Sequence, residues 1–228
     1  MRSPATDTSR LKAPFWVAAV LTVCLLNAGA YAQKAPEQGQ GRLFPPIDLG
    51  LLESPDRAAW QKPEQIMDVL HIADGSKVAD IGAGAGWFTI RLARRVGPNG
   101  VVYSQDVQRE MLVAIGRRVK REGLQNVQTR QGDGSNPNLQ VTRLDAIVVV
   151  DAYQEVKDRV TFLKNLAGAL KPTGLIGVVN WNPGRGGPGP PENERVEKAS
   201  VISDVTAAGL RIVDEELLPY QYMLVLAK

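Results

Sequence analysis

The sequence predicts an α/β protein with a doubly wound, mostly parallel seven-stranded sheet that carries an antiparallel C-terminal hairpin strand. Strand-like and helix-like segments alternate from Lys77 onward, which predicts right-handed crossovers between parallel strands. Residues 146–150 are apolar throughout, as in a central parallel strand that is buried on both faces. The last two strand-like runs have no helix between them, so we expect them to pair as a hairpin at a sheet edge.

The individual elements follow from residue type and periodicity. Short runs of β-branched or apolar residues predict strands at residues 77–81, 101–105, 127–131, 144–150, 175–179, 210–218 and 222–227. Longer amphipathic runs predict helices at residues 87–96, 108–122, 157–170 and 196–208. Between the fifth strand and the last helix, eight of the ten residues 182–191 are Gly or Pro. Such a loop is either a functional lid over an acceptor or a disordered segment.

Composition excludes several classes of mechanism. The 228 residues are 44% hydrophobic and 22% charged, with a formal charge of +3, which is typical of a globular protein with an ample core. One cysteine cannot form an internal disulfide or a cysteine-based zinc site, and one histidine cannot supply the imidazoles of most catalytic zinc sites. We therefore expect no metal site, and we interpret His71 as an ordinary helix-terminal histidine.

The N-terminus has the three-part pattern of a secretory signal peptide. Within residues 1–32, basic residues precede the apolar run 15–26, and small residues 28–32 follow it. The sequence predicts cleavage before Gln33 and export to the periplasm or the medium, with no stable membrane association afterwards. An uncleaved N-terminal membrane anchor is the alternative, although twelve apolar residues are short for a membrane span.

Two further regions complete the predicted organisation. Residues 33–55 form a linker or N-terminal extension, because their first part is polar and contains Gly and Pro. Residues 56–228 form one domain.

The most specific motif is a glycine turn between a strand and a helix, at residues 78–86. Glycines let the backbone approach a ligand at the carboxyl end of a strand, where doubly wound sheets bind nucleotide-type ligands. The dinucleotide fingerprint is disfavoured because its third glycine would fall at Trp87, and no Gly-Lys-Ser/Thr follows to make a Walker phosphate loop.

Three acids recur at the ends of the predicted strands. Asp106, 24 residues past Gly82, is placed to accept the hydroxyl protons of a ribose. Asp133 could accept from an exocyclic adenine amine, and Asp80 could help to hold an ammonium group, directly or through water. Each aspartate taken singly is more often a turn-former or a cap, so the argument depends on the set and its spacing.

These residues resemble the first motif of the class I S-adenosylmethionine-dependent methyltransferases, acid-x-Gly-x-Gly-x-Gly, which spans residues 80–86 here. The resemblance covers roughly residue 63 to the C-terminus and includes residues 106–112 and 170–174. It implies that S-adenosylmethionine is the cofactor. The implied cofactor-binding residues are Asp80, Gly82 and Gly84 around the methionine part, Asp106 at the ribose, and Val107 and Asp133 at the adenine. Gly86 and Gly134 complete the implied cofactor-binding set.

Three further segments resemble a narrower group. The signal peptide, residues 60–63 and residues 218–222 are together similar to a bacterial group of exported methyltransferase-like proteins. The one basic run, residues 117–121, lacks interleaved aromatic residues and is interpreted as a solvated helix face, so we expect no nucleic-acid partner.

The resemblance implies transfer of a methyl group to a small or medium-sized acceptor at oxygen, nitrogen or carbon. The family places acceptor-side groups after the fourth strand, which favours Asp151, Tyr153 and Glu155 as catalytic candidates. We expect Asp151 and Tyr153 to face the methyl group, with the Tyr153 hydroxyl orienting the acceptor. Glu155 is either a general base or the cap of the following helix. The alternative function is an exported, non-catalytic protein that binds S-adenosylmethionine or another nucleoside.

Overall fold

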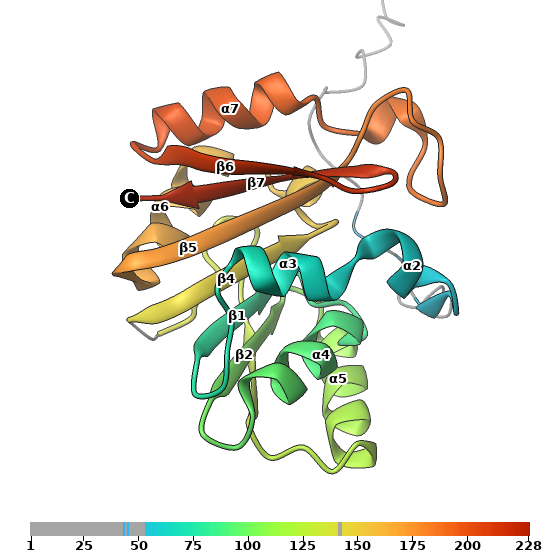
Figure 1. Cartoon of the computed structure of the whole chain (residues 1–228), viewed down its shortest axis with the longest axis vertical. Helices are drawn as coiled ribbons and strands as arrows, with labels where there is room; N and C mark the ends of the chain where they lie inside the picture. Colours follow the sequence, from blue (N-terminus) through green and yellow to red (C-terminus); the bar gives the residue numbers. More distant parts are fainter. Residues whose placement is uncertain (1–42, 44, 46–52, 141–142) are drawn as a thin grey trace, which may run out of the picture. The chain divides into compact units, whose positions relative to one another are not determined.

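The computed structural model describes residues 43, 45, 53–140 and 143–228 (Figure 1). The predicted signal peptide and most of the predicted linker lie outside the described residues. Within the described part of the chain, no helix has the length and hydrophobicity needed to span a membrane.

The fold is built on one seven-stranded sheet in the order β3-β2-β1-β4-β5-β7-β6. The strands are β1 (Lys77–Ile81), β2 (Val101–Asp106), β3 (Val127–Gln131), β4 (Leu144–Val150), β5 (Leu170–Trp181), β6 (Arg211–Leu217) and β7 (Gln221–Ala227). Strands β1 to β5 are parallel, whereas β7 runs antiparallel to both β5 and the edge strand β6. The predicted fold class is therefore confirmed, including the antiparallel C-terminal hairpin.

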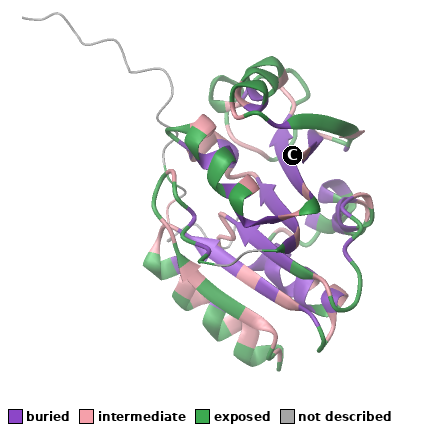
Figure 2. Ribbon diagram, turned by 90° about the vertical axis from the view of Figure 1, so that its left-hand side faces the viewer, coloured by how far each residue is buried: buried purple, intermediate pink, exposed green. Residues whose placement is uncertain are grey.

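Helices cover both faces of this sheet. They are α2 (Arg57–Gln61), α3 (Pro63–Val69), α4 (Trp87–Val96), α5 (Arg109–Arg121), α6 (Arg159–Ala169) and α7 (Lys198–Ala207), with short 3-10 turns at Tyr153–Glu155 (η2) and Glu192–Glu194 (η3). One apolar cluster joins α3 and α4 to the sheet, and a second joins α6 and α7 to the opposite face. Figure 2 shows that the central strands are buried, as the apolar run 146–150 predicts.

The fifth strand is longer than predicted because it begins at the Lys-Pro-Thr-Gly segment. Leu144 of β4 faces Leu170, but Ala146 faces Leu175, so residues 171–174 bulge out of the register. A bulge accommodates Pro172, which has no N–H to donate to a ladder hydrogen bond.

The N-cap of helix α6 is Asp158 and not Glu155, which the sequence analysis considered. The side chain of Asp158 accepts a hydrogen bond from the Thr161 N–H at 3.0 Å, and the helix begins at Arg159. Glu155 instead ends the η2 turn. The hypothesis that Glu155 caps this helix is therefore wrong.

The glycine turn after β1 requires its glycines for two separate reasons. Gly82, Gly84 and Gly86 have φ values of 69°, 54° and 80°, in the left-handed region that L-residues rarely adopt. In addition, a Cβ at Gly82 would overlap the Cβ of Ala152, just after β4. The turn is therefore pressed against the end of the neighbouring strand.

We predict that Gly82→Ala destabilises the fold more than Gly75→Ala does. Gly75 also has a positive φ of 80° but has open space around its Cβ position, so its substitution costs only about 1–2 kcal/mol of backbone strain. At Gly82 the overlap with Ala152 adds about 1–3 kcal/mol. Urea unfolding of both variants measures the difference. The double change Gly82→Ala with Ala152→Gly should recover the second cost, and equal losses at both glycines would contradict the contact.

Candidate functional site

Three carboxylates, two of them buried and one partly exposed, lie at one edge of the sheet. Strand β1 lies between β2 and β4, and parallel strands bring their carboxyl ends together. Asp80 lies near the end of β1, Asp106 ends β2, and Asp151 follows β4 directly. This edge therefore combines negative charge with the glycine turn.

The Asp106 carboxylate ties the glycine turn to the end of β2. Its two oxygens accept hydrogen bonds from the backbone N–H groups of Gly84 and Gln108, each at 2.9 Å. Burial raises the pKa of Asp106, and these backbone hydrogen bonds oppose the rise. Each carboxylate oxygen has a further lone pair, so the group can also accept hydroxyl protons from a ribose.

Asp80 connects β1 to the first turn of α4. It accepts a hydrogen bond from the Thr89 hydroxyl at 2.6 Å, and that hydroxyl lies 2.8 Å from the hydroxyl of Ser104. Burial raises the pKa of the Asp80 carboxyl to about 6, against the hydrogen bond from Thr89 and the positive charge of Arg57. The predicted contact of Asp80 with an ammonium group stays a prediction.

The residues predicted for the adenine lie beside β2 but are more open. Asp133 is exposed, and its Oδ1 accepts from the N–H groups of Ser135 and Asn136 at 2.9 and 2.6 Å, which lowers its pKa. Asp133 therefore organises its own turn, which includes the exposed Gly134. Val107 is half-buried at the end of β2. The adenine contacts of these residues stay predictions.

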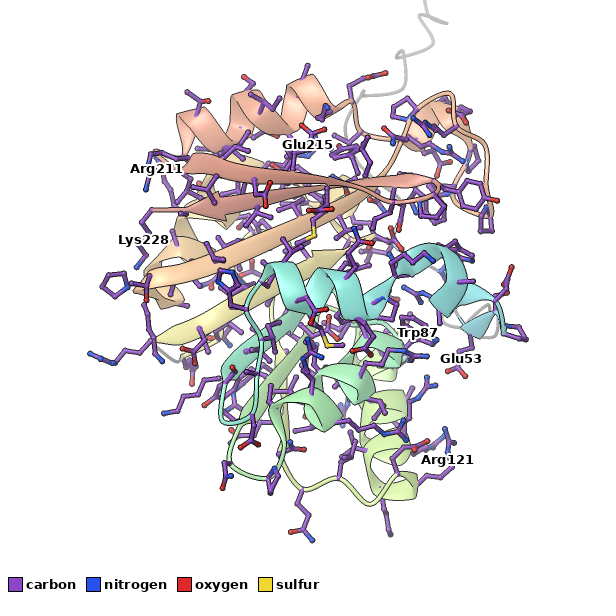
Figure 3. The ribbon with its side chains drawn as sticks, viewed as in Figure 1. Glu53, Trp87, Arg121, Arg211, Glu215 and Lys228 are labelled. Atoms are coloured by element: carbon purple, nitrogen blue, oxygen red, sulfur yellow. The ribbon has the colours of Figure 1, made fainter. Side chains whose placement is uncertain are left out.

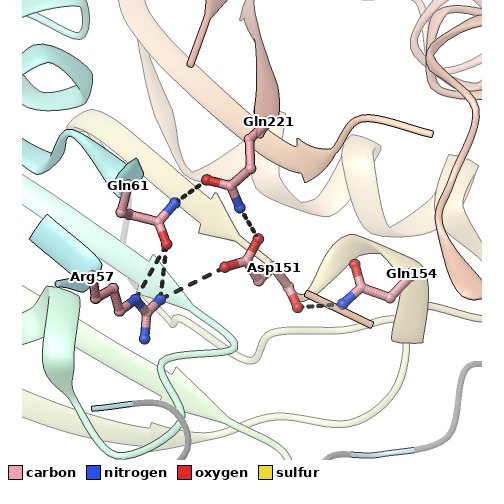
Figure 4. A network of polar contacts seen from close by, with 5 residues as sticks. All are labelled: Arg57, Gln61, Asp151, Gln154 and Gln221. Carbon is pink, nitrogen blue, oxygen red and sulfur yellow. Dashed lines mark hydrogen bonds and ion pairs between the residues drawn. The ribbon is translucent and has the colours of Figure 1, made fainter. Parts of the chain in front are cut away.

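Asp151 is the centre of a polar network that joins three elements (Figure 4). Its carboxylate accepts a hydrogen bond from Gln221 of β7 and lies 3.7 Å from Nη2 of Arg57 in α2. The Arg57 Nε and Nη2 groups donate to Gln61 Oε1 at 3.2 and 3.1 Å, and Gln61 Nε2 donates to Gln221 Oε1 at 2.5 Å. Gln154 donates to the Asp151 backbone carbonyl.

The environment of Asp151 suits a proton acceptor near neutral pH. Burial raises its pKa to about 7, although the charge of Arg57 and the hydrogen bond from Gln221 lower it. The side chain keeps 19% of its surface exposed, so the carboxylate can reach a ligand. A group with such a pKa and partial access is a candidate general base.

Tyr153 has a different place from the one predicted. Its ring is fully buried among the residues that join α6 and α7 to the sheet, and its hydroxyl donates to Asp204 of α7 at 3.0 Å. We therefore assign Tyr153 to packing of the α7 layer rather than to orientation of an acceptor. Glu155 is half-buried two residues further on, and its role as a base stays a prediction.

Helix α2 supplies residues that the sequence did not reveal. The guanidinium of Arg57 lies 4.4 Å from the centroid of the Trp87 ring, and the rings of Trp60 and Trp181 are 5.1 Å apart. Trp87 is labelled in Figure 3 near the start of α4. A helix of five residues is too short to show periodicity in the sequence. The sequence analysis noted this region only through residues 60–63, as part of the similarity to exported methyltransferase-like proteins.

The Gly/Pro loop packs against the end of β5. A Cβ at Gly189 would overlap the Trp181 ring, whose centroid lies 5.6 Å from the Arg195 guanidinium. Arg195 donates to the carbonyls of Pro190 and Asn182, each at 3.0 Å. The loop is therefore held over Trp181, while its role as a lid stays a prediction.

The basic run on α5 is only partly a solvated face. Arg121 is exposed at the end of α5 (Figure 3). The Arg118 side chain, however, is only 15% exposed and donates to the Ala85 carbonyl in the glycine turn at 3.4 Å, besides its ion pair with Glu53. Among the described residues, no group of three or more His, Cys, Asp or Glu could hold a metal ion.

Comparison with known proteins identifies the domain that carries this site. Residues 78–174, from β1 into the bulge of β5, match the family model described as a methyltransferase domain. Over these residues the chain is similar to methyltransferase domains. This finding agrees with the resemblance to class I S-adenosylmethionine-dependent enzymes, and S-adenosylmethionine is the cofactor of that class.

Individual relatives support the domain and the fold. A demethylmenaquinone methyltransferase from Anoxybacillus flavithermus is 31% identical over 118 residues, 52% of this chain and 49% of that protein. A S-adenosylmethionine-dependent methyltransferase structure from Aquifex aeolicus has a TM-score of 0.75 and 26% identity, and the match covers 80% of this chain and 98% of the other.

A further structure, the [4+2]-cyclase SpnF, shares the fold alone, with a TM-score of 0.61 and 21% identity over 72% of this chain and 61% of the other. This chain spans about half the length of the curated relatives it matches. The fold by itself therefore does not decide the reaction.

The residues at the strand ends fit the cofactor chemically. The glycine turn carries no side chains at Gly82 and Gly84, so a ligand can approach its backbone. Asp106 offers carboxylate oxygens for ribose hydroxyls, and Asp80 and Asp151 offer negative charge for the sulfonium and ammonium groups.

We predict that Asp151→Asn stabilises the protein more at pH 8 than at pH 5. The pKa of Asp151 is about 7 in the folded state against an ordinary 3.8, so the folded state holds a proton that the unfolded state has released. Stability is therefore lost as pH rises between about 4 and 7, and asparagine avoids this loss. We expect a small gain in melting temperature at pH 5 and a gain that is larger by about 5 °C at pH 8.

Asp133→Asn is the matched control for this pH dependence. Backbone hydrogen bonds lower the pKa of Asp133, so it stays ionised in both states between pH 5 and 8. Its variant should therefore differ from the wild type by the same amount at both pH values. A pH-independent difference for Asp151→Asn as well would contradict the assigned environment.

Proposed function

We propose that the protein transfers the methyl group of S-adenosylmethionine to a small-molecule acceptor at the carboxyl edge of its sheet. The observation that carries this proposal is the Asp106 carboxylate, which accepts from Gly84 and holds the glycine turn, while Gly82 of that turn packs against Ala152, the residue after Asp151. When bound, S-adenosylmethionine supplies a methyl carbon that its positively charged sulfur already activates. The protein then needs mainly to align a nucleophile with that carbon.

Each side chain has a proposed task. Asp106 accepts the ribose hydroxyls, and Asp80 and the glycine turn face the methionine part. Asp151 faces the acceptor. Held by these residues, S-adenosylmethionine would supply the methyl group to the nucleophile and would leave as S-adenosylhomocysteine, with the electron pair of the carbon–sulfur bond retained on sulfur. Asp151 takes the proton where the nucleophile carries one.

The acceptor belongs to the small-molecule class in this proposal. Curated relatives are named demethylmenaquinone methyltransferases, which makes demethylmenaquinone the first acceptor to test. The family match ends at residue 174, before Trp181 and the Gly/Pro loop, so the part of the chain that packs around Trp181 lies outside it.

We predict that S-adenosylhomocysteine stabilises the purified full-length chain. At a hundredfold excess over the dissociation constant, binding to the native state adds about 2.7 kcal/mol, or roughly 5–10 °C in melting temperature. Asp106→Ala should remove most of this rise, because it deletes the ribose acceptor. Asp214→Ala on the exposed strand β6 is the control and should keep the rise. An unchanged melting temperature at millimolar ligand would refute the cofactor site.

Turnover separates the enzyme from the non-catalytic alternative. Methyl-labelled S-adenosylmethionine is incubated with demethylmenaquinone in oxidised and reduced form and with hydroxylated aromatic acceptors. Transfer of label supports the proposed function. Binding without transfer to any of these acceptors would favour a protein that retains the cofactor fold without turnover.

We also propose that residues 1–32 export the domain, as the similarity to exported methyltransferase-like proteins implies. The support is the order of basic, apolar and small residues in the sequence. A reporter enzyme that is active only outside the cytoplasm, fused after Lys228, should be active in a bacterial host. Deletion of residues 2–32 should abolish that activity, and a mature N-terminus at Gln33 would exclude the uncleaved anchor. Activity that survives the deletion would contradict the signal.

A further inference from the structure

Four basic side chains of α5 are exposed and have no carboxylate partner. They are Arg109, Arg117, Lys120 and Arg121. Within the described part of the chain, no ion pair or side-chain hydrogen bond involves them. By contrast, Arg94 and Arg95 of α4 are both paired with carboxylates. The fold therefore neutralises the charge of α4 but leaves that of α5 open to a partner.

Three of these bases share one face of the helix with two small neutral residues. Positions 109, 113, 117 and 120 follow the spacing of a single helical face, which is about 16 Å long. Val113 on this face is 46% exposed, and a Cβ at Gly116 would meet nothing within 4 Å. We call Arg109, Val113, Gly116, Arg117 and Lys120 the basic face of α5.

The excess of positive charge is local to this helix. Helix α5 contains five basic residues and one acid, Glu110, whereas the whole chain has a formal charge of only +3. Only Met111 and Ile115 of the helix are buried, so most of its circumference faces outward. Arg121 extends the positive charge at the end of the helix (Figure 3). A negatively charged surface is therefore attracted to α5 rather than to the protein as a whole.

The residue types of the basic face favour a lipid surface as this partner. Proteins read nucleic-acid bases with amide side chains or stack them on aromatic rings, and protein interfaces are usually anchored by buried aromatic residues. The basic face has neither kind of side chain. A layer of anionic phospholipids requires only basic residues within a Debye length, and a small apolar residue between them can enter its interfacial region.

We propose that the basic face of α5 binds membranes that contain anionic phospholipids. The contact is peripheral and reversible, unlike a membrane span. It gives a role to residues 117–121, which the sequence alone favoured as a solvated face. The inference goes beyond the proposed function and does not depend on it.

The basic face begins at the carboxyl edge of the sheet. Arg109 directly follows Gln108, whose backbone N–H donates to the Asp106 carboxylate. A membrane bound along α5 therefore also approaches the edge at which the cofactor is proposed to bind.

The test places an environment-sensitive fluorophore on the basic face. The full-length chain has one cysteine, so Cys24→Ser combined with Val113→Cys directs the dye to α5. Vesicles that mix phosphatidylglycerol with phosphatidylcholine should shift its emission to the blue, whereas vesicles of phosphatidylcholine alone should not. At about 1 M salt the shift should disappear, because the Debye length falls to about 3 Å.

Val213→Cys in the same Cys24→Ser chain is the matched control. Val213 lies on β6 and has the same exposed fraction as Val113, 46%. Attachment through residues 1–32 would bring both positions to the same vesicles, so only contact with α5 separates them. The dye at position 213 should therefore show no shift.

The contribution of the charges is measured in the chain labelled at position 113. Arg117→Gln with Lys120→Gln should raise the lipid concentration at half the shift by about 25-fold, because each base near an anionic surface contributes about fivefold. Lys157→Gln with Lys164→Gln removes two exposed charges elsewhere and should change this concentration by less than about twofold. Circular dichroism checks that each variant is folded.

Three results would overturn the inference. The first is an equal shift with phosphatidylcholine alone, or at Val213→Cys. The second is an unchanged lipid requirement after Arg117→Gln with Lys120→Gln. The third is a shift with duplex DNA but none with the anionic vesicles, which would assign the basic face to nucleic acid instead.

Discussion

Burial of carboxylates at the ends of three adjacent parallel strands is the constraint on which this site depends. Each buried carboxylate must be hydrogen-bonded or paired with a positive charge. Asp106 uses backbone N–H groups of the glycine turn and of Gln108, Asp80 uses the Thr89 hydroxyl, and Asp151 uses Gln221 and Arg57. These contacts fasten the turn, α4 and α2 to the sheet, so the groups proposed to bind cofactor also organise the edge of the fold.

The hydrogen bonds and the charge of Arg57 only partly offset the cost of burying these carboxylates. The pKa values of Asp80 and Asp151 remain raised, to about 6 and 7, because burial outweighs their hydrogen bonds and the charge of Arg57. A ligand that brings positive charge to this edge would stabilise the ionised carboxylates, by the same linkage that makes the stability of the fold depend on pH. The charges that limit the stability of the fold therefore favour a cationic cofactor.

The sequence predicted the sheet and the cofactor side well because local patterns specify them. Strands β1, β3 and β4 and helix α4 have the predicted bounds, and the glycine turn adopts the positive φ values that its composition implies. The acceptor side depends on contacts between distant residues. Gln61 meets Gln221 across 160 residues, and Tyr153 meets Asp204 across 51. Sequence periodicity does not reveal such pairs. The contact of Arg57 with Asp151 was therefore missed, and the Tyr153 hydroxyl was assigned to the acceptor.

The central claim is that the carboxyl edge of the sheet binds the cofactor. A crystal structure of the chain with S-adenosylhomocysteine tests it most directly. The account predicts both ribose hydroxyls on Asp106 and the sulfur facing Asp151. A ligand bound elsewhere, with Asp106 still contacting only Gly84 and Gln108, would contradict the account.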